Sequence, residues 1–318
     1  MPAGIATTVN TPNYLGMLFN ANRRRSAFLS LIGGIDGAGS VITENIQFPV
    51  SVAYTIDNPS TPEITEDDSV KPGTPTYIGL EQAKNVVQIF QEDVTVSRLR
   101  SMNRGALQGI NTAGAEPEEK DELARQVVLH LEKMKRDMNY TAINGTYQDA
   151  GITSAAGKLT TRGIVEAITS NVVEGALDVA NIAKMIRLAF DKGTFDTPVI
   201  FANSENRQAI SALYQVASLT EVDADRFTAG VAVNKIVTEF GDVYLATDND
   251  VPADVIFLAD IAYVKPVFMR DVDTGEVITV KPLSQRGGTA LEIYGTFGLD
   301  HNNELQHSKL VINAELGA

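Results

Sequence analysis

The sequence contains no cysteine and no tryptophan, and only 3 of its 318 residues are histidine. The absence of cysteine excludes disulfides and thiolate metal sites and is compatible with a reducing compartment. Long apolar runs are also missing, so the sequence predicts no membrane-spanning segment. Residues 1–16 lack a basic stretch followed by an apolar one, and we therefore expect no secretory signal.

Basic residues are few relative to acidic ones. There are 26 Lys and Arg against 40 Asp and Glu, which gives a net charge of −14. A protein that reads a nucleic-acid sequence presents a basic face to the phosphates, so this class is disfavoured. The apolar content of 44% is enough for a substantial core in one large domain or two smaller ones.

Signals for catalysis are scarce. His301 and His307 flank a polar turn without a third ligand at a metal-binding spacing, and His130 lies beside the apolar stripe of a predicted helix. We expect structural roles for all three. Close carboxylate pairs such as Asp248 and Asp250 are unavoidable among 40 acidic residues and do not indicate a glycosidase site. The sequence therefore predicts no enzyme, no cofactor and no metal site.

Two strand-like segments enclose a stretch rich in proline and acidic residues. Residues 41–56, VITENIQFPVSVAYTI, place apolar side chains on one parity, which is typical of a strand with one buried face. Pro49 lies on the polar parity and cannot donate a hydrogen bond, which indicates an edge strand or a bulge. The return segment 76–100 also alternates, but its phase slips, which predicts a bend. Between them, residues 57–76 hold four prolines and five carboxylates against one lysine.

The length of this hairpin predicts that it projects from the body. The sixteen residues from 41 to 56 span about 50 Å at about 3.3 Å per residue. A compact chain of this size has a radius of gyration near ~20 Å. An isolated two-stranded ribbon is only marginally stable in water, so its apolar face needs cover. We expect another subunit to supply that cover.

Residues 116–144 carry the strongest helix pattern of the chain. Pro117 and the acidic residues after it suit the first turn of a helix and its dipole. Gly145 lies where a terminating glycine belongs. Six apolar side chains recur at helical spacing in between: Leu123, Val127, Leu131, Met134, Met138 and Ala142. We therefore predict one long amphipathic helix that ends near residue 144.

The following region alternates helix and strand signals. Asp178 is the predicted N-cap of one helix, and Asn203 or Ser204 is the predicted N-cap of the next. Residues 197–202 have the pattern of a buried strand, and residues 231–312 consist mostly of strand segments. Together with the hairpin and the long helix, this pattern indicates an α+β fold.

The order of these elements resembles the major capsid proteins of tailed bacteriophages with the Hong Kong 97-type fold. Three segments are also similar in wording: NVVQIFQEDVTVS (85–97) resembles the return of the E-loop, RDMNYTAINGT (136–146) the end of the spine helix, and FGDVYLATDNDVPADVIFLAD (240–260) strands of the A-domain. The resemblance implies an N-terminal arm at 1–35, an E-loop β-hairpin at 36–97, a P-domain at 98–176 with a spine helix at about 117–144, an α/β A-domain at 177–262, and return strands of both domains at 263–318.

The same resemblance implies a structural protein that self-assembles as hexamers and pentamers into an icosahedral capsid. The shell would enclose double-stranded phage DNA without reading its sequence. Further implied partners are a separate scaffolding protein, a portal and decoration proteins, with no membrane. The implied location is the virion capsid, assembled in the cytoplasm of the host bacterium.

We expect nine residues to contact neighbouring subunits. Arg23, Arg24 and Arg25 in the arm form a basic patch that either stays solvated or meets acidic surface on a neighbouring chain or packaged nucleic acid. The other six lie on the hairpin: Phe48, Tyr54, Glu66, Asp67, Asp68 and Lys71. Lysine–asparagine cross-links, which some members of the family form, are not expected, because nothing marks Lys71 or Lys84 as reactive.

Two other interpretations stay open at the level of sequence. An encapsulin-like cellular nanocompartment shares the fold and would enclose a different cargo. A secreted or surface protein that processes carbohydrates belongs to a different class, and the absence of tryptophan and of a secretory signal disfavours it.

Overall fold

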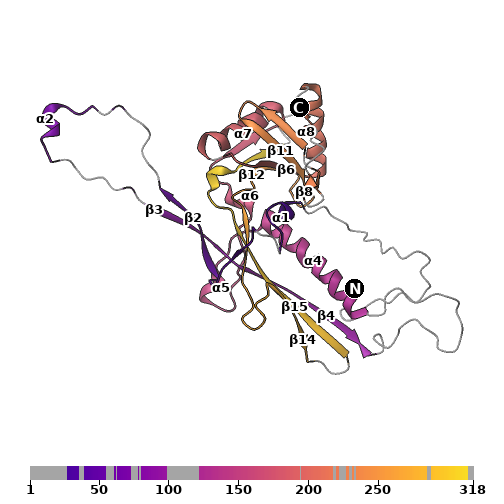
Figure 1. Ribbon diagram of the computed structural model, residues 1–318. Coiled ribbons are helices and arrows are strands. Elements are labelled where there is room, and N and C mark those ends of the chain that lie inside the picture. Colours follow the sequence, from indigo (N-terminus) through magenta and orange to yellow (C-terminus); the bar gives the residue numbers. More distant parts are fainter. Residues whose placement is uncertain are drawn as a thin grey trace.

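The computed structural model of the chain describes residues 27–35, 39–54, 61, 63–72, 78, 80–98, 122–193, 195–217, 220–221, 227–228, 231–232, 234–284 and 288–313. These residues form two large sheets, a long helix and a two-stranded hairpin that projects from the body (Figure 1). The predicted α+β fold is confirmed.

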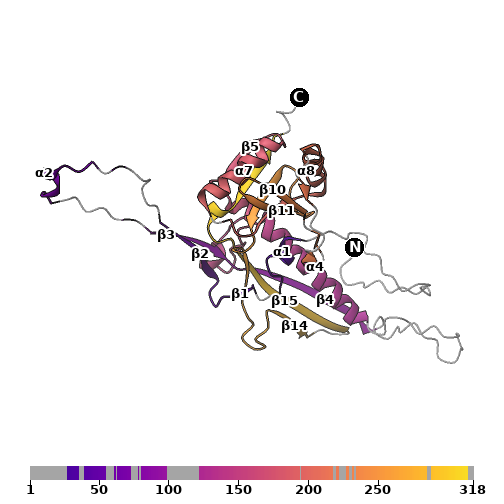
Figure 2. The same ribbon diagram turned by 45° about the horizontal axis from the view of Figure 1, so that its top comes forward.

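A seven-stranded sheet forms the upper part of the body in Figures 1 and 2. Its strand β6 shows why the sheet is buried on both faces. Val199 and Phe201 enter one hydrophobic core, whereas Ile200 and Ala202 enter another, as the alternation of side chains along a strand requires. The predicted buried strand at 197–202 is confirmed. In spatial order the strands are β5 (Val172–Gly175), β16 (Ser308–Ile312), β12 (Val255–Asp260), β6 (Pro198–Ala202), β11 (Gly241–Thr247), β10 (Asn234–Thr238) and β7 (Thr220–Glu221).

Two helices pack against this sheet, and their N-caps are the predicted ones. The helix α7 (Val179–Lys192) begins after Asp178, whose Oδ1 accepts a hydrogen bond of 2.6 Å from the Asn181 N–H. The helix α8 (Ser204–Ala217) begins after Asn203, whose Oδ1 accepts one of 2.8 Å from the Asn206 N–H. Both caps satisfy backbone donors that the first turn of a helix leaves unpaired.

The second sheet is built around β15 (Gly288–Asp300), the longest strand. Antiparallel to it run β4 (Gln88–Ser97), β14 (Ile278–Leu283) and β13 (Lys265–Phe268), and β1 (Val41–Ile42) pairs in parallel with β13. The long pairing of β4 with β15 makes the return arm of the predicted hairpin a core strand of the body.

The long helix α4 (Glu122–Asn144) packs across this sheet, and the predicted helix is confirmed from residue 122 onward. Met134, Met138 and Ala142 of the predicted stripe are buried. Gly145 follows the helix, and a Cβ added there would clash with the carbonyl oxygen of Thr161. The close approach of that backbone explains why a glycine ends the helix.

Short elements complete the described structure. They are α1 (Phe28–Leu31), α2 (Glu66–Ser69), α5 (Ala150–Thr153), α6 (Ile164–Ala167), the 3-10 helix η1 (Glu304–Gln306), and the paired strands β8 (Phe227–Thr228) and β9 (Val231–Ala232).

The prediction of one continuous strand over residues 41–56 is wrong, because two separate strands lie in this range. Thr43 Oγ1 accepts a hydrogen bond of 3.1 Å from the Asn45 N–H, and this local turn separates β1 from β2 (Gln47–Tyr54). Only β2 pairs with the returning strand β3 (Leu80–Val86), and the register shifts between Pro49 and Ser51. The predicted bulge is confirmed, but the regular ribbon is shorter than its sequence pattern suggested.

Candidate intersubunit surfaces

The tip of the hairpin carries a short helix that the sequence pattern did not reveal. Thr65 caps α2, because its Oγ1 accepts a hydrogen bond from the Asp68 N–H and donates one of 2.6 Å to Asp68 Oδ2. Lys71 Nζ donates to Asp68 Oδ1 at 2.8 Å, and this hydrogen bond holds the pKa of Asp68 below its usual value. The sequence did contain a signal for this helix, namely a threonine that can cap it followed by three acidic residues in its first turn.

Glu66 and Asp67 present their carboxylates to solvent at the same tip. All residues from 63 to 72 are exposed, and within the described part of the chain neither carboxylate has an ion-pair partner. Asp68 and Lys71 are instead paired with each other. Two of the four charged tip candidates are therefore available for contacts outside the subunit.

The base of the hairpin is anchored inside its own subunit. Phe48 is only 5% exposed and packs with Val50, Val87 and Val267. The structure thus does not place Phe48, a predicted subunit contact, on an exposed surface. Tyr54 pairs through its backbone with Leu80 in the β2–β3 ladder, and its side chain lies outside the described part.

A buried carboxylate fixes the start of the described chain. Asp248 follows β11, and its Oδ2 accepts hydrogen bonds from the backbone N–H groups of Ala27 at 2.7 Å and Phe28 at 2.9 Å. Asn139 of α4 donates to Asp248 at 3.1 Å, and its own Oδ1 accepts from the Leu29 N–H at 2.9 Å. This cluster joins α1, the long helix and the loop after β11.

Burial raises the pKa of Asp248, and hydrogen bonds from Phe28, Asp250 and Asn139 oppose that shift. Asp250 belongs to the same cluster, since its Oδ2 accepts from Asn139 Nδ2 at 2.7 Å. The sequence did not single out this pair of aspartates, since the only local signal was their place directly after a buried strand. The predicted arm residues Arg23, Arg24 and Arg25 lie outside the described residues.

The contact between α4 and β4 is electrostatic at its exposed edge. Glu92 of β4 forms an ion pair with Lys133 of α4, and its Oε2 lies in a hydrogen bond of 3.1 Å with His130 Nδ1. Burial raises the pKa of Glu92, but the hydrogen bonds from Lys133 and His130 outweigh it and hold that pKa below its usual value. His130 is thus a boundary residue, as predicted.

The other two histidines are buried in the body. His307 Nδ1 accepts a hydrogen bond of 3.2 Å from the Asp260 N–H, and His307 Nε2 donates one of 2.7 Å to the His301 carbonyl oxygen. The described residues contain no group of three or more potential metal ligands. Among the described helices, none combines the length and apolar character needed to cross a bilayer.

Solved structures with a similar fold include capsids and an encapsulin. The capsid asymmetric unit of Cyanophage A-1(L) is 13% identical with a TM-score of 0.62, and the match covers 96% of each chain. The capsid of Myoviridae phage XM1 is 14% identical with a TM-score of 0.52, covering 98% of this chain and all of that one (100%). The holo-SrpI encapsulin of Synechococcus elongatus PCC 7942 is 12% identical with a TM-score of 0.60, covering 96% of this chain and 92% of that one. At such identities these matches show the fold alone.

A comparison with protein families is more specific. No curated protein matches this chain. Residues 1–314 match the family described as SU10 major capsid protein, which is nearly the whole chain. The protein is therefore a structural component of a tailed-phage capsid shell, not an enzyme, and it belongs to the SU10 major capsid protein family.

Proposed function

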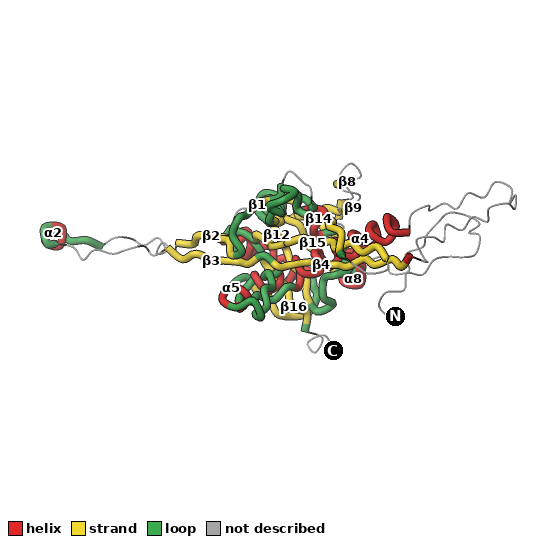
Figure 3. Tube along the Cα trace, turned by 90° about the horizontal axis from the view of Figure 1, so that it is seen from below, coloured by secondary structure: helices red, strands yellow, loops and turns green. Residues whose placement is uncertain are grey.

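We propose that the β2–β3 hairpin lies over a neighbouring subunit in the hexamers and pentamers of an icosahedral shell. The observation that carries this proposal is the projection of the hairpin away from the body, with α2 at its far end (Figure 3). An isolated two-stranded hairpin is only marginally stable in water, so a projecting one needs a surface to lie on. A second copy of the same chain supplies that surface in a homo-oligomeric shell.

The energetics of such a contact are sufficient for assembly. A typical specific interface buries about 1,200–2,000 Å². At about 25 cal/mol per Å² this gives a gross stabilisation of tens of kcal/mol before the costs of association. Each subunit of a closed shell makes several such contacts, which together resist outward pressure.

In this role Glu66 and Asp67 of the tip pair with basic groups across a subunit boundary. The shell encloses double-stranded DNA, and the net charge of −14 limits adsorption of the DNA to the inner wall. We further propose a separate scaffolding protein, a portal and decoration proteins as partners, and assembly in the cytoplasm of the host bacterium. The division into arm, E-loop, P-domain and A-domain at the predicted boundaries is part of this proposal.

A second candidate is a cellular nanocompartment of the encapsulin type. The observation in its favour is the TM-score of 0.60 to the encapsulin structure. Terminase and portal genes beside the coding sequence support the phage shell, and their absence together with a packaged enzyme supports the nanocompartment. The match of the family over residues 1–314 favours the phage shell.

The proposal is tested by reversing the charge of the tip. In the variant Glu66→Lys/Asp67→Lys the cap between Thr65 and Asp68 is untouched, so α2 and the body keep their fold. We expect this variant to yield folded subunits that assemble into few or no closed shells, as measured by negative-stain imaging and sedimentation.

The matched control is Glu66→Gln/Asp67→Asn, which removes charge without reversing it. We expect its assembly yield to lie between the wild type and the lysine variant. Normal particles from the lysine variant would show that the tip charges do not take part in assembly.

A further inference from the structure

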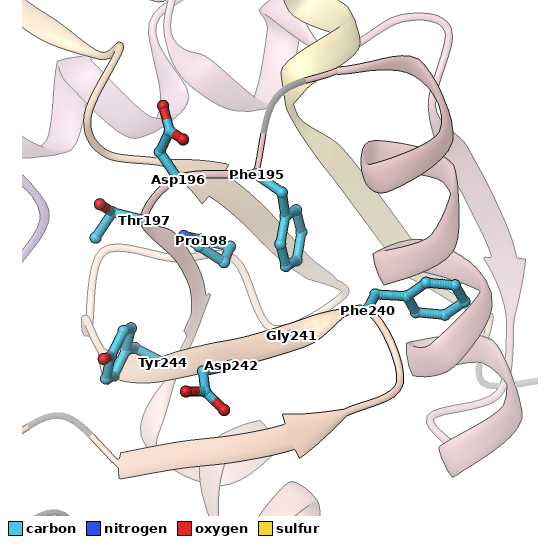
Figure 4. Close-up of a pocket in the computed structure, with 8 residues that line it drawn as sticks. All are labelled: Phe195, Asp196, Thr197, Pro198, Phe240, Gly241, Asp242 and Tyr244. Carbon is cyan, nitrogen blue, oxygen red and sulfur yellow. The ribbon is translucent and has the colours of Figure 1, made fainter.

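A hollow opens beside the start of the described chain, on the body and away from the hairpin. Its volume is about 530 Å³, within the range of small ligand sites. Figure 4 shows Asp196 and Asp242 on opposite sides, with Phe195 and Pro198 between them. The full lining consists of Phe195, Asp196, Thr197, Pro198, Phe240, Gly241, Asp242 and Tyr244.

The chain enters the described structure next to this hollow. Ala27 packs against Tyr244, which lines it, and the N–H of Ala27 is held by Asp248. Asp242 and Tyr244 alternate along β11 and therefore share one face of the sheet, on which Tyr244 packs against Ala27. The residues that precede Ala27 thus start on the face that carries Asp242 and Tyr244.

This end of the sheet face is open and acidic. The Asp242 side chain is 46% exposed although it pairs with Lys235 Nζ at 2.9 Å. Asp196, on the other side, is exposed and accepts a hydrogen bond from the Tyr263 hydroxyl. The lining contains two aspartates and no basic residue, and Lys235 pairs with Asp242 alone, so these side chains together carry a net negative charge. Val237, whose side chain points to the same face as Asp242, is 45% exposed.

One aromatic side chain adds a second feature that suits arginine. Tyr244 lies on the same face of the sheet as Asp242, whereas the rings of Phe195 and Phe240 pack with Phe190 of α7 on the other face. Guanidinium groups stack on aromatic faces and bind carboxylates through two hydrogen bonds, which an ammonium group does less well. A segment with several arginines matches both the charge and the shape of this site.

The sequence places such a segment within reach. Arg25 is two residues before Ala27 and Arg23 is four residues before it. Their Cα atoms therefore lie within about 7 Å and 14 Å of that of Ala27. Tyr244 and Asp242 are about 7 Å apart along β11. The arginines can span the distance from Tyr244 to Asp242 and reach the hollow between Asp242 and Asp196.

We propose that Arg23, Arg24 and Arg25 bind in this hollow of their own subunit, against Asp242, Tyr244 and Asp196. The contact continues the anchoring by Asp248 and fixes the base of the arm on the seven-stranded sheet. The residues before Arg23 then start from the sheet of their own subunit when they reach toward other subunits. The inference goes beyond the role proposed for the hairpin and does not depend on it.

Chemical cross-linking tests the proposal, because the chain contains no native cysteine. Arg24→Cys is combined with Asp242→Cys in the full-length chain and treated with a short bismaleimide. We expect a cross-link within one chain, seen as a monomer band with one linker added and the two peptides joined in mass spectrometry. The matched control joins Arg24→Cys with Asp67→Cys, an exposed acidic position on the hairpin tip, and we expect no monomer cross-link from it.

Two results would overturn the proposal. A ladder of multimers from the Arg24→Cys/Asp242→Cys chain would place the arginines on a neighbouring subunit. A yield no higher than that of the control would show that the arginines do not bind in the hollow.

Charge reversal gives an independent readout. Replacing the three arginines with Glu, or both Asp196 and Asp242 with Lys, should speed hydrogen exchange at the amides of residues 23–27 by about tenfold. Combining the two sets should restore slow exchange, because opposite charges again face each other. A combined variant that exchanges as fast as the single sets would contradict the proposed pairing. The aspartates are exposed, so circular dichroism should show an unchanged fold.

Discussion

At the scale of single residues, Asp248 connects three parts of the chain that are far apart in sequence. Its Oδ2 accepts hydrogen bonds from the backbone N–H groups of Ala27 and Phe28, and its Oδ1 accepts one of 2.9 Å from the Asp250 N–H. An asparagine has one side-chain oxygen. In Asp248→Asn, either the N–H groups of Ala27 and Phe28 or the N–H of Asp250 must therefore face an amide N–H₂ group, which cannot accept their hydrogen bonds. Unpaired buried donors cost about 1–3 kcal/mol.

For Asp248→Asn we expect the free energy of unfolding to fall by about 1–2 kcal/mol. The loss is limited because burial raises the pKa of Asp248, so removal of the charge also relieves a desolvation cost. Amide exchange at Ala27 and Phe28 should rise more than elsewhere. Denaturant titration and hydrogen exchange measure both effects, with Asp254→Asn as the control, because Asp254 lies exposed in the same loop. Equal behaviour of the two variants would contradict the anchoring role.

The buried histidine His301 makes stability depend on pH. Burial, followed by Coulombic repulsion from His307 and Arg162, lowers the pKa of His301 from 6.5 to about 4. The folded chain therefore resists protonation of this ring, whereas the unfolded chain takes up a proton near pH 6.5. Stability from the neutral ring is fully present above pH 6.5 and is lost as pH falls toward 4, by about 3 kcal/mol.

Replacing His301 with Phe should flatten the stability profile between pH 6.5 and 4. Burial also lowers the pKa of His307, so part of the slope should remain. Urea unfolding at a series of pH values measures the slope, and NMR titration follows the three histidine rings directly. A His301 ring that titrates near 6.5 in the folded chain would refute the explanation.

At the scale of elements, the hairpin is held at its base by close packing. Gly298 of β15 faces Phe48, and a Cβ added at Gly298 would lie 2.8 Å from Phe48 Cε1 and 3.3 Å from the Val86 carbonyl oxygen. Gly298→Ala should therefore displace the ring and loosen the β2–β3 ladder, at a cost of about 1–3 kcal/mol.

Hydrogen exchange at residues 47–50 and 84–86 measures this loosening. The second change Phe48→Leu should recover part of the protection by making room for the added methyl group. Gly39→Ala is the matched control, because its Cβ would meet only ordinary contacts, such as the Ile32 carbonyl oxygen at 3.4 Å. Unchanged exchange in Gly298→Ala would show that the base tolerates the methyl group.

The elements also show what the sequence could predict. The long helix, the buried strand β6 and the caps Asp178 and Asn203 follow local rules of periodicity and capping, and all were predicted. The break after β1 was missed, because the apolar parity continues through Ile46 while a hydrogen bond from the Asn45 backbone N–H to the Thr43 side chain turns the backbone. Local competition of this kind does not alter the hydrophobic pattern.

The Asp248 cluster could not be predicted for a different reason. Its partners Ala27 and Asn139 lie 221 and 109 residues away along the chain, and the contacts to Ala27 and Phe28 use backbone N–H groups. No residue type in the arm signals such an acceptor. Only the folded arrangement reveals it, and the same holds for the hollow beside Tyr244.

At the scale of the whole molecule, the shell should be held by non-covalent contacts alone. Particles boiled in detergent should run as one band at 34.2 kDa, the mass of the chain. The reason is that Lys71, one of the two hairpin lysines, is already paired with Asp68 and exposed to solvent. A ladder above this band would reveal cross-links. The single variants Lys84→Arg and Lys71→Arg, tested separately, would then identify the lysine that forms them.

The continuity of β3 with β4 has a mechanical consequence. Tension on the hairpin tip passes through Val87 directly into β4, along the axis of a strand that is paired with β15 from Gln88 to Ser97. A pull in that direction loads the whole ladder in shear, so its hydrogen bonds must yield together and cannot open one at a time. The outgoing strand β2 has no such extension, since the turn at Thr43 interrupts it. Of the two hairpin strands, β3 therefore bears most of a pulling force. A force that a neighbouring subunit applies to the hairpin is transmitted through β3 and β4 to the sheet that packs against the long helix.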